Sequence, residues 1–184
     1  RMNSGKIIET VLREINRSVS GVSHESLEAL VNAVNREKRI FCDGVGRSRL
    51  KAEGFAMRLI QMGFTALVVG EATTPAITRD DILLICSASG ETPMLVEHAA
   101  KAKKVGAAIM LITTSEASSL AVLSDSMITI DASSKTTRSD ASVQPMGSLF
   151  EQSTAILLDI IVLCLMEKHG ISSDDMYRNH SNLE

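Results

Sequence analysis

The stretch Ile82-Leu83-Leu84-Ile85-Cys86-Ser87-Ala88-Ser89-Gly90-Glu91-Thr92-Pro93 decides how this chain folds. Its first five residues form a continuous apolar run, which is the pattern of a strand buried on both faces. The following residues are small or polar, with Gly90 suited to a tight bend, and Pro93 suits the first position of a helix. Apolar residues then recur at helical spacing as far as Val105. The stretch therefore predicts a strand, a short polar loop and a helix.

A polar loop that runs into a helix in this way favours a bound anion. The first turn of a helix carries unpaired N–H groups and a partial positive charge, and Ser87, Ser89 and Thr92 add hydroxyl donors around it. The loop contains no lysine and no pair of acidic metal ligands, which excludes a nucleotide-binding P-loop. Two interpretations remain: a site for a small phosphate that needs no metal, or a hydroxyl-rich helix cap without a ligand.

The rest of the chain repeats this alternation of strand and helix. We expect strands over 39–43, 65–69, 82–86, 108–112 and 126–130. Such alternation predicts a doubly wound α/β fold, in which helices cover both sides of a five-stranded parallel sheet. Ligands of these folds bind beyond the carboxyl ends of the strands. Because the turn 44–48 and the loop 87–92 both follow strands, we expect them to meet at that edge and to hold the ligand.

The two ends of the chain lie outside this alternation. Ser4 and Ser23 are expected to cap two N-terminal helices, whose apolar faces need cover from the main core or from a partner chain. Ser173 is expected to cap a last short turn that ends near Arg178. The polar stretch 131–144 predicts a long loop. The helix that follows, to about residue 168, is apolar nearly all round, which indicates burial on every side and predicts a subunit interface. We expect one domain over 1–184, made of N-terminal helices (1–38), the sheet with its crossover helices (39–131), and a C-terminal helix and tail (145–184).

Composition limits the classes of protein that fit. The 184 residues are 45% hydrophobic, enough for one sizeable core, and the net charge of −3 gives no general attraction to nucleic acid or to anionic membranes. Cys42, Cys86 and Cys164 lack the spacing of a metal or redox site and are predicted to be core residues in a reducing compartment. The longest apolar run, 155–166, contains Asp159 and is shorter than the roughly 20 residues that span a bilayer. With no signal-peptide pattern, we expect a cytoplasmic protein without a membrane segment.

Seven motifs are spread over the chain from about residue 30 to its end. They are Gly44-x-Gly-Arg-Ser48, Gly54-Phe-Ala-Met-Arg-Leu59, Thr74-Pro-Ala-Ile-Thr78, Ser87-Ala-Ser-Gly-Glu-Thr92, Ser118-Ser-Leu-Ala121, Pro145-Met-Gly-Ser-Leu-Phe-Glu151 and the tail His180-Ser-Asn-Leu-Glu184. Together they resemble the 6-phospho-3-hexuloisomerase family of the sugar isomerase (SIS) domain superfamily. The sequence departs from that pattern at Ala88, where members often carry Gly, and at Glu116-Ala117, where they often carry Asn-Pro.

The resemblance implies an activity: isomerisation between D-arabino-hex-3-ulose 6-phosphate and D-fructose 6-phosphate through an enediol, in the ribulose monophosphate pathway of formaldehyde fixation. It also implies a flavodoxin-like SIS sheet, no metal or organic cofactor, and a homotetramer without a nucleic-acid or membrane partner. Two alternatives stay open, an isomerase of another sugar phosphate and a non-catalytic sugar-phosphate-binding module. Regulators of the latter kind carry a basic helix-turn-helix, for which the first 38 residues are too short and too evenly charged.

The resemblance further implies roles for single residues. Glu151 is expected to move the proton between neighbouring carbons; the alternative is a solvated carboxylate that complements the helix dipole. His180 is expected to open the sugar ring or to shuttle protons between the enediol oxygens, in its own or a neighbouring subunit; the alternative is a frayed terminal histidine. Substrate binding is expected at Gly44, Gly46, Arg47, Ser48, Ser87, Ala88, Ser89, Gly90 and Thr92.

Four more charged or titratable side chains have expectations of their own. Arg47 either binds the sugar phosphate or forms a structural salt bridge. Glu91 either caps the first turn of the helix after its loop or orients a partner group. His98 is expected on an exposed helix face between Glu97 and Lys101. Asp159, a carboxylate within an apolar helix, is expected to meet a partner at an interface, because a buried charge needs one.

Overall fold

The computed structural model describes residues 3–132 and 142–183. Within these residues the chain forms seven helices and five strands. Their order and bounds are α1 (Ser4–Ser20), α2 (His24–Ala33), β1 (Arg39–Gly44), α3 (Arg47–Gln61), β2 (Thr65–Val68), β3 (Ile82–Cys86), α4 (Pro93–Val105), β4 (Ala108–Thr113), α5 (Ser119–Leu123), β5 (Ser126–Thr129), α6 (Ser148–His169) and α7 (Ser173–Arg178).

The five strands form one parallel sheet in the order β2-β1-β3-β4-β5. This confirms the predicted doubly wound fold. The chain leaves β1 in one direction to form β2 and then returns to the other side of β1 to form β3, so the strand order switches between β1 and β3. All five residues of β3 are buried, as its apolar run predicts. The switch between β1 and β3 is where folds of this kind bind their ligands.

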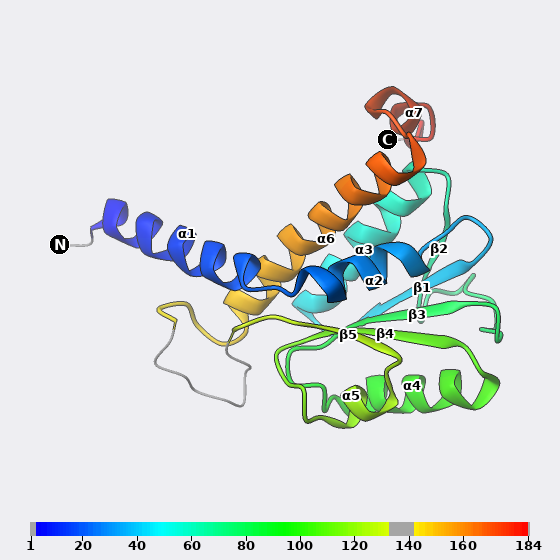
Figure 1. Cartoon of the computed structure of the whole chain (residues 1–184), viewed down its shortest axis with the longest axis horizontal. Coiled ribbons are helices and arrows are strands. Elements are labelled where there is room, and N and C mark those ends of the chain that lie inside the picture. Colours follow the sequence, from blue (N-terminus) through cyan, green and yellow to red (C-terminus); the bar gives the residue numbers. More distant parts are fainter. Residues whose placement is uncertain (1–2, 133–141, 184) are drawn as a thin grey trace.

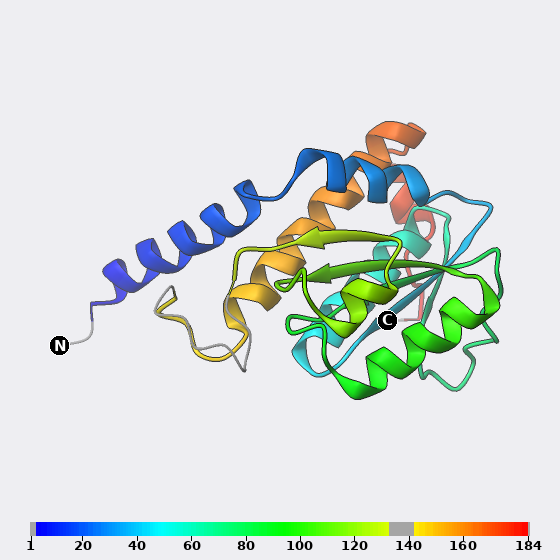
Figure 2. The ribbon, with the colours of Figure 1, turned by 60° about the horizontal axis from the view of Figure 1, so that its bottom comes forward.

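Helices cover both faces of the sheet and create two separate cores. Figures 1 and 2 show α2, α3 and α6 on one face and α4 and α5 on the other. The first core gathers side chains such as Leu59, Phe150 and Ile161 against the α3 side of the strands. The second gathers Leu95 and Leu120 against the α4 side. Alternate residues of each strand enter the two cores, which is why the strands are apolar throughout rather than alternating.

Proline and glycine set the ends of several helices where the sequence predicts them. Pro93 occupies the first turn of α4, and Gly106 and Gly170 end α4 and α6 in the left-handed conformation, with φ of +85° and +62°. Ser23 caps α2 as expected. The predicted cap of α1 is one residue off.

Asn3 caps α1, because its side-chain oxygen accepts a hydrogen bond from Lys6 N at 3.1 Å, and Ser4 is the first helical residue. A similar displacement occurs at the last helix. Ser172, not Ser173, caps α7, and it forms a reciprocal capping box with Asp175. In both cases two adjacent polar residues compete for the cap, and the sequence pattern alone does not separate them.

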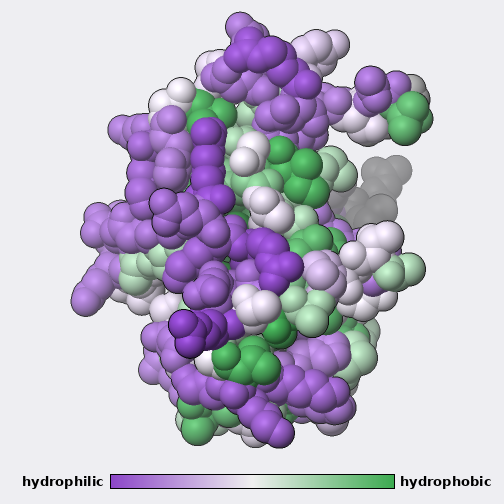
Figure 3. All heavy atoms as spheres, turned by 90° about the vertical axis from the view of Figure 1, so that its right-hand side faces the viewer, coloured by the Kyte–Doolittle hydropathy of each residue, from purple (hydrophilic) through white to green (hydrophobic). Residues whose placement is uncertain are grey.

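Two apolar surfaces remain uncovered within the chain. Helix α1 extends away from the body of the fold (Figures 1 and 2), and Ile7, Ile8 and Leu12 on it are 48%, 59% and 62% exposed. On α6, Ile156 and Leu163 are also exposed, so the helix is not buried on every side by its own chain. The face shown in Figure 3, by contrast, is mostly hydrophilic with smaller apolar patches between the polar residues.

Helix α6 is also the one described helix that is long and apolar enough to cross a membrane by length and composition alone. It has 22 residues and a mean hydropathy of 1.9 in its most apolar window. This differs from the expectation based on the run 155–166, because the helix continues toward its start through Ser153 and Thr154 and past the charged Glu151 to Phe150 and Leu149. Of that window, 56% is buried inside the fold, as in the core helix of a globular domain.

The cysteines are free thiols, and two of them are core residues. Cys42 and Cys86 are fully buried on adjacent strands, and burial raises the pKa of both, to about 12 for Cys86. A thiol that stays protonated is a poor nucleophile. Cys86 therefore acts as a core residue although it adjoins the polar loop. Cys164 is only partly buried, contrary to the expectation of a core position, because it lies toward the outer side of α6.

Candidate active site

The turn after β1 and the loop after β3 begin at the same level of the sheet. Gly44 is the register partner of Cys86, so the turn 44–48 and the loop 87–92 leave adjacent strands side by side at the carboxyl edge. This is also the edge at which the strand order switches. The predicted meeting of the two loops follows directly from the register of β1 on β3.

Hydroxyl groups shape the loop 87–92 from within. Ser87 Oγ accepts a hydrogen bond from Gly90 N at 3.2 Å, and Ser89 Oγ accepts one from Glu91 N at 3.2 Å. Thr92 occupies the cap position of α4, but its hydroxyl makes no capping hydrogen bond among the described residues. The loop therefore folds around the start of α4, whose first-turn N–H groups favour an anion.

Only glycine fits at position 90 of this loop, because of its backbone conformation and the space around it. Its φ is +66°, and an added Cβ would lie 2.6 Å from the Cβ of Ser118 in the loop after β4. The end of β4 also holds this loop, because the carbonyl of Ala88 accepts hydrogen bonds from the hydroxyls of Thr113 and Thr114 at 3.0 and 2.8 Å. Ala88 contributes its backbone here, so its difference from the family pattern leaves these contacts intact.

A third segment reaches the same edge, namely the first turn of α6. Glu151 lies there and is only 3% exposed, and its Oε2 accepts a hydrogen bond from Nε of Arg47. Arg47 is the first residue of α3, after the turn in which Gly46 adopts a φ of +61°. The structure therefore brings Arg47 and Glu151 together as an ion pair, with the arginine side chain 60% exposed and the carboxylate buried.

The chain enters α6 through a strained and anchored segment. Met146 has a φ of +56°, in the left-handed region that non-glycine residues rarely adopt. Just before it, three residues of the same segment donate hydrogen bonds to the buried carboxylate of Glu14 on α1, from Ser142 Oγ, Val143 N and Gln144 Nε2 at 2.8, 2.9 and 3.2 Å. Residues 133–141 of the predicted loop lie outside the described residues.

Glu91 bonds to the first turn of α5, the short helix after β4. Its two carboxylate oxygens accept hydrogen bonds from the backbone N and the hydroxyl of Ser119, both at 2.7 Å. These hydrogen bonds lower the pKa of Glu91. The cap of α5 is Ser118. The expectation that Glu91 caps the helix after its own loop is therefore wrong, and the alternative, that it orients a partner group, agrees with its bonds to Ser119.

His98 is not the exposed surface residue that its neighbours Glu97 and Lys101 suggest. Its side chain is 28% exposed, and its Nδ1 lies 2.8 Å from Oδ2 of Asp43, which is 1% exposed at the end of β1. The sequence pattern assigns no role to Asp43. A signal was present, because an acidic residue ends an otherwise apolar strand, but its partner lies 55 residues away.

The structure places His180 far from Glu151 within one chain. The neighbouring Asn179 donates a hydrogen bond from Nδ2 to Gln61 O at 3.0 Å, and Gln61 ends α3, whereas Arg47 begins it. The 15 residues of α3 separate these ends by roughly 20 Å. Figure 1 shows α7 and the start of α6 at opposite ends of the fold. His180 is exposed and stacks on Tyr177.

Asp159 is exposed on α6 within the chain, on the same helix as the exposed Ile156 and Leu163. It is therefore not buried by its own chain, and its expected contact at an interface stays a prediction. The described residues contain no group of three or more His, Cys, Asp and Glu side chains arranged to hold a metal ion.

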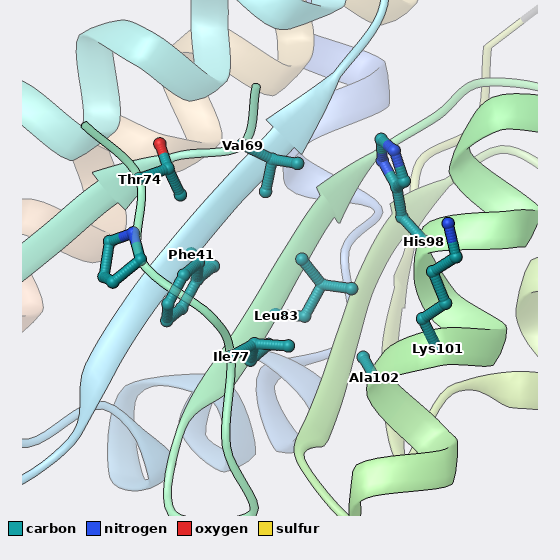
Figure 4. Close-up of a pocket in the computed structure, with 9 residues that line it drawn as sticks. Phe41, Val69, Thr74, Ile77, Leu83, His98, Lys101 and Ala102 are labelled. Carbon is teal, nitrogen blue, oxygen red and sulfur yellow. The ribbon is translucent and has the colours of Figure 1, made fainter. Parts of the chain in front are cut away.

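A separate hollow of about 150 Å³ lies on the α4 side of the sheet. Figure 4 shows apolar side chains such as Phe41, Leu83 and Ile77 on its floor, with His98 and Lys101 reaching over it from α4. It contains none of the predicted substrate residues. The convergence of the loops with Arg47 and Glu151, not this hollow, defines the candidate site.

The chain is similar to known proteins over most of its length. Residues 33–161 match the model of the SIS domain. The chain is 39% identical to a 3-hexulose-6-phosphate isomerase of Bacillus subtilis (strain 168), over 100% of both chains. It is 36% identical to the enzyme of the same name from Mycobacterium gastri, over 96% of this chain and 89% of the relative. A Methanococcus jannaschii protein, whose crystal structure was taken to imply 3-hexulose-6-phosphate isomerase function, superposes with a TM-score of 0.84 at 29% identity, over 97% and 99% of the two chains.

Proposed function

The chain belongs to the SIS domain family, and we propose that it is an isomerase that interconverts 3-hexulose 6-phosphate and fructose 6-phosphate. Its full-length similarity to enzymes of that name supports the substrate and the reaction. The reaction moves a carbonyl group between C3 and C2 of the sugar. It places the protein in the ribulose monophosphate pathway of formaldehyde fixation.

One observation carries the proposal at the level of the site. A buried carboxylate, Glu151, lies against Arg47 at the edge where the turn 44–48 and the loop 87–92 leave adjacent strands. The loops and the start of α4 supply hydroxyls and N–H groups that suit a phosphate dianion. The carboxylate supplies a base beside them, which is the second group that a sugar-phosphate isomerase needs.

The chemistry consists of proton transfers at carbon and at oxygen. Glu151 takes the proton from C3 of fructose 6-phosphate, the electron pair of that C–H bond forms the C2–C3 double bond, and the former C2 carbonyl oxygen takes up the negative charge. A proton passes from the hydroxyl at C3 to the oxygen at C2, and Glu151 returns its proton to C2, which leaves the carbonyl at C3. A positioned acid–base group of this kind contributes about 10²–10⁴-fold to the rate. Arg47 holds the carboxylate in place and puts a positive charge near the enediol oxygens. We propose this mechanism without a metal or an organic cofactor.

We propose that binding of the sugar phosphate uses the residues of the two loops. Ser87, Ser89 and Thr92, with the backbone of Ala88 and Gly90, receive the phosphate. Gly44, Gly46, Arg47 and Ser48 face it from the adjacent turn. The hydroxyl of Thr92 supports this assignment, since it makes no capping bond among the described residues. Because Ser87 and Ser89 accept hydrogen bonds from the loop itself, each hydroxyl proton remains available for an anion.

We propose that His180 acts in the site of a neighbouring subunit. Within one chain it lies roughly 20 Å from the Arg47 end of α3, at the other end of that helix. The exposed apolar residues of α1 and α6 could form contacts between subunits. We propose that the assembly is a homotetramer and that the protein is cytoplasmic. In that assembly His180 would open the sugar ring or pass protons between the enediol oxygens.

Isotope exchange tests the proposed reaction directly. The protein is incubated with fructose 6-phosphate in deuterated water, and the sugar is followed by NMR. We expect deuterium at C3, because the proposed enediol spans C2 and C3, and none in Glu151→Gln. Deuterium at C1 would instead indicate an aldose–ketose isomerase that forms a C1–C2 enediol, and no exchange at any carbon would contradict isomerase activity on this sugar.

A further inference from the structure

The buried carboxylate of Asp43 connects the two segments that carry the proposed substrate contacts. Asp43 is the last residue but one of β1, and its side chain is 1% exposed. Its Oδ1 accepts a hydrogen bond from Gly44 N at 2.8 Å, at the start of the turn 44–48. Its Oδ2 lies 2.8 Å from Nδ1 of His98 on α4, the helix that begins directly after the loop 87–92.

Such a carboxylate is costly unless both oxygens are satisfied. Burial of an unpaired charge is strongly unfavourable in a folded protein. Since an ionised carboxylate only accepts hydrogen bonds, the proton of the Asp43–His98 bond lies on Nδ1. The pair is therefore fixed in geometry, and any displacement of α4 along the sheet leaves the buried Oδ2 without its donor.

The turn is held from its other side as well. An added Cβ at Gly44 would lie 3.0 Å from Arg49 N and 3.1 Å from the carbonyl carbon of Ser48, so the turn packs closely against the start of α3. Asp43 thus connects the turn 44–48, which packs against α3, to α4 on the opposite face of the sheet. The ring of His98 spans the distance, and Figure 4 shows it reaching from α4 toward the strands.

We infer that Asp43 and His98 are positioning residues for the proposed isomerase. The pair sets the spacing between the turn 44–48 and the phosphate loop 87–92, and through it the affinity for the sugar phosphate. This inference rests on the proposed function. It does not assign proton transfer to His98, because Asp43 and His98 lie on the α4 side of the sheet, whereas Glu151 belongs to the opposite helical layer.

Two substitutions of His98 by amides of different length test whether its hydrogen bond to Asp43, and not only its packing, positions the loop. In His98→Asn the amide nitrogen takes the position of Nδ1 and still donates to Asp43. In His98→Gln the longer side chain fills the same space but carries its donor near the position of Nε2. We expect the KM for fructose 6-phosphate to rise about tenfold in His98→Gln, with a smaller change in kcat, and to stay close to the wild-type value in His98→Asn.

A matched control lies at the opposite edge of the sheet. Asp81 is also buried, and Arg39 donates to its two oxygens at 2.8 and 2.6 Å, but this pair joins no substrate segment. Arg39→Ala should lower thermal stability and leave the KM within about twofold of wild type. An unchanged KM in His98→Gln, or an equal rise in Arg39→Ala, would overturn the inference.

A second measurement keeps this test independent of turnover. Titration with inorganic phosphate reports the affinity of the loop alone, and we expect weaker binding in His98→Gln than in His98→Asn. If wild-type protein shows no isotope exchange, the proposed reaction fails, yet the phosphate titration still decides whether the pair positions the loop. Equal phosphate affinity in the two variants counts against the pair whatever the reaction.

Discussion

Arg47 donates a hydrogen bond from Nε to Oε2 of Glu151, and so joins two residues that lie 104 positions apart in the sequence. The contact connects the turn after β1 to the first turn of α6. It holds the carboxylate in one orientation before a sugar enters, which is how preorganised sites avoid rearrangement during the reaction.

Glu151→Gln should abolish turnover while substrate affinity stays near normal. The amide keeps the shape of the side chain but cannot take a proton, so kcat should fall by at least about 10²-fold. Steady-state kinetics and a binding titration with fructose 6-phosphate measure the two effects. Glu97→Gln, at an exposed carboxylate on α4 that pairs with Lys101, is the control and should behave as wild type. Full activity in Glu151→Gln would remove Glu151 from the mechanism.

Ser89→Ala combined with Thr92→Ala should weaken binding more than it slows turnover. The two hydroxyls are proposed to contact the phosphate, which does not change during the reaction, so their loss should raise the KM about 10–100-fold. Ser124→Ala removes a hydroxyl that bonds the carbonyl of Ala121 at the far end of α5, and it should leave the KM unchanged. The proposed phosphate site is wrong if the double variant keeps the wild-type KM.

Subunit mixing tests the place of His180. Glu151→Gln and His180→Gln should each be nearly inactive alone. If His180 serves a neighbouring site, hybrid oligomers of the two variants contain some sites with both native residues, and mixing after mild dissociation should restore part of the activity. Activity that never rises above the sum of the separate variants would argue against a shared site, and full activity of His180→Gln alone would exclude His180.

Glu14 should stabilise the entry to α6 in a pH-dependent manner. Burial alone raises the pKa of Glu14, but hydrogen bonds from Val143, Ser142 and Gln144 and the charge of Arg17 outweigh it, so the pKa lies below its ordinary value of 4.5. The stabilisation is therefore complete above pH 4.5 and is lost as the pH falls through the lowered pKa.

Chemical denaturation of Glu14→Gln provides the measurement. At pH 7 the variant should be less stable than wild type by about 1–3 kcal/mol, and the difference should shrink in acid as the wild-type carboxylate takes up its proton. Glu9→Gln, an exposed acid on the same helix, is the matched control. A stability difference that does not depend on pH would contradict the role of the charge.

Leu12→Lys should reduce the size of the oligomer. Leu12 is 62% exposed beside Ile8 on the outer part of α1, where a charge would disrupt an apolar contact between subunits but would cost the isolated chain little. Sedimentation velocity of the variant should show smaller species than wild type. Glu9→Lys changes charge on the same helix and should keep the native size, whereas equal sizes for Leu12→Lys and wild type would place the interface elsewhere.

The sequence predicts the sheet well because local signals and packing agree there. The apolar run of β3, Pro93 at the start of α4 and glycines at the helix ends each fix a boundary by a strong physical constraint. The caps of α1 and α7 are each displaced by one residue, because Asn3 and Ser172 are polar neighbours of the residues that the pattern favours. Caps depend on backbone dihedrals that a pattern of residue types does not specify.

The candidate site is predictable only where one loop carries its own signal. The composition of the hydroxyl-rich loop 87–92 predicts a phosphate site, and the parallel strands place the turn 44–48 beside it. The pairing of His98 with Asp43 could not be predicted from the sequence, because Glu97 and Lys101 indicate a polar, exposed face of α4. Side-chain partners that meet across two layers depend on the three-dimensional packing.

The close approach of Gly90 to Ser118 has a bearing on attempts to engineer this loop. Any side chain at position 90 would collide with Ser118 in the segment after β4. In a saturation library that includes position 90, most variants would therefore have a distorted loop. Position 88 is only partly buried and contributes its backbone to the site, so it offers diversity without that collision. A designer who wishes to enlarge this part of the loop should vary Ser118 and keep Gly90, because glycine adopts a φ of +66° without strain.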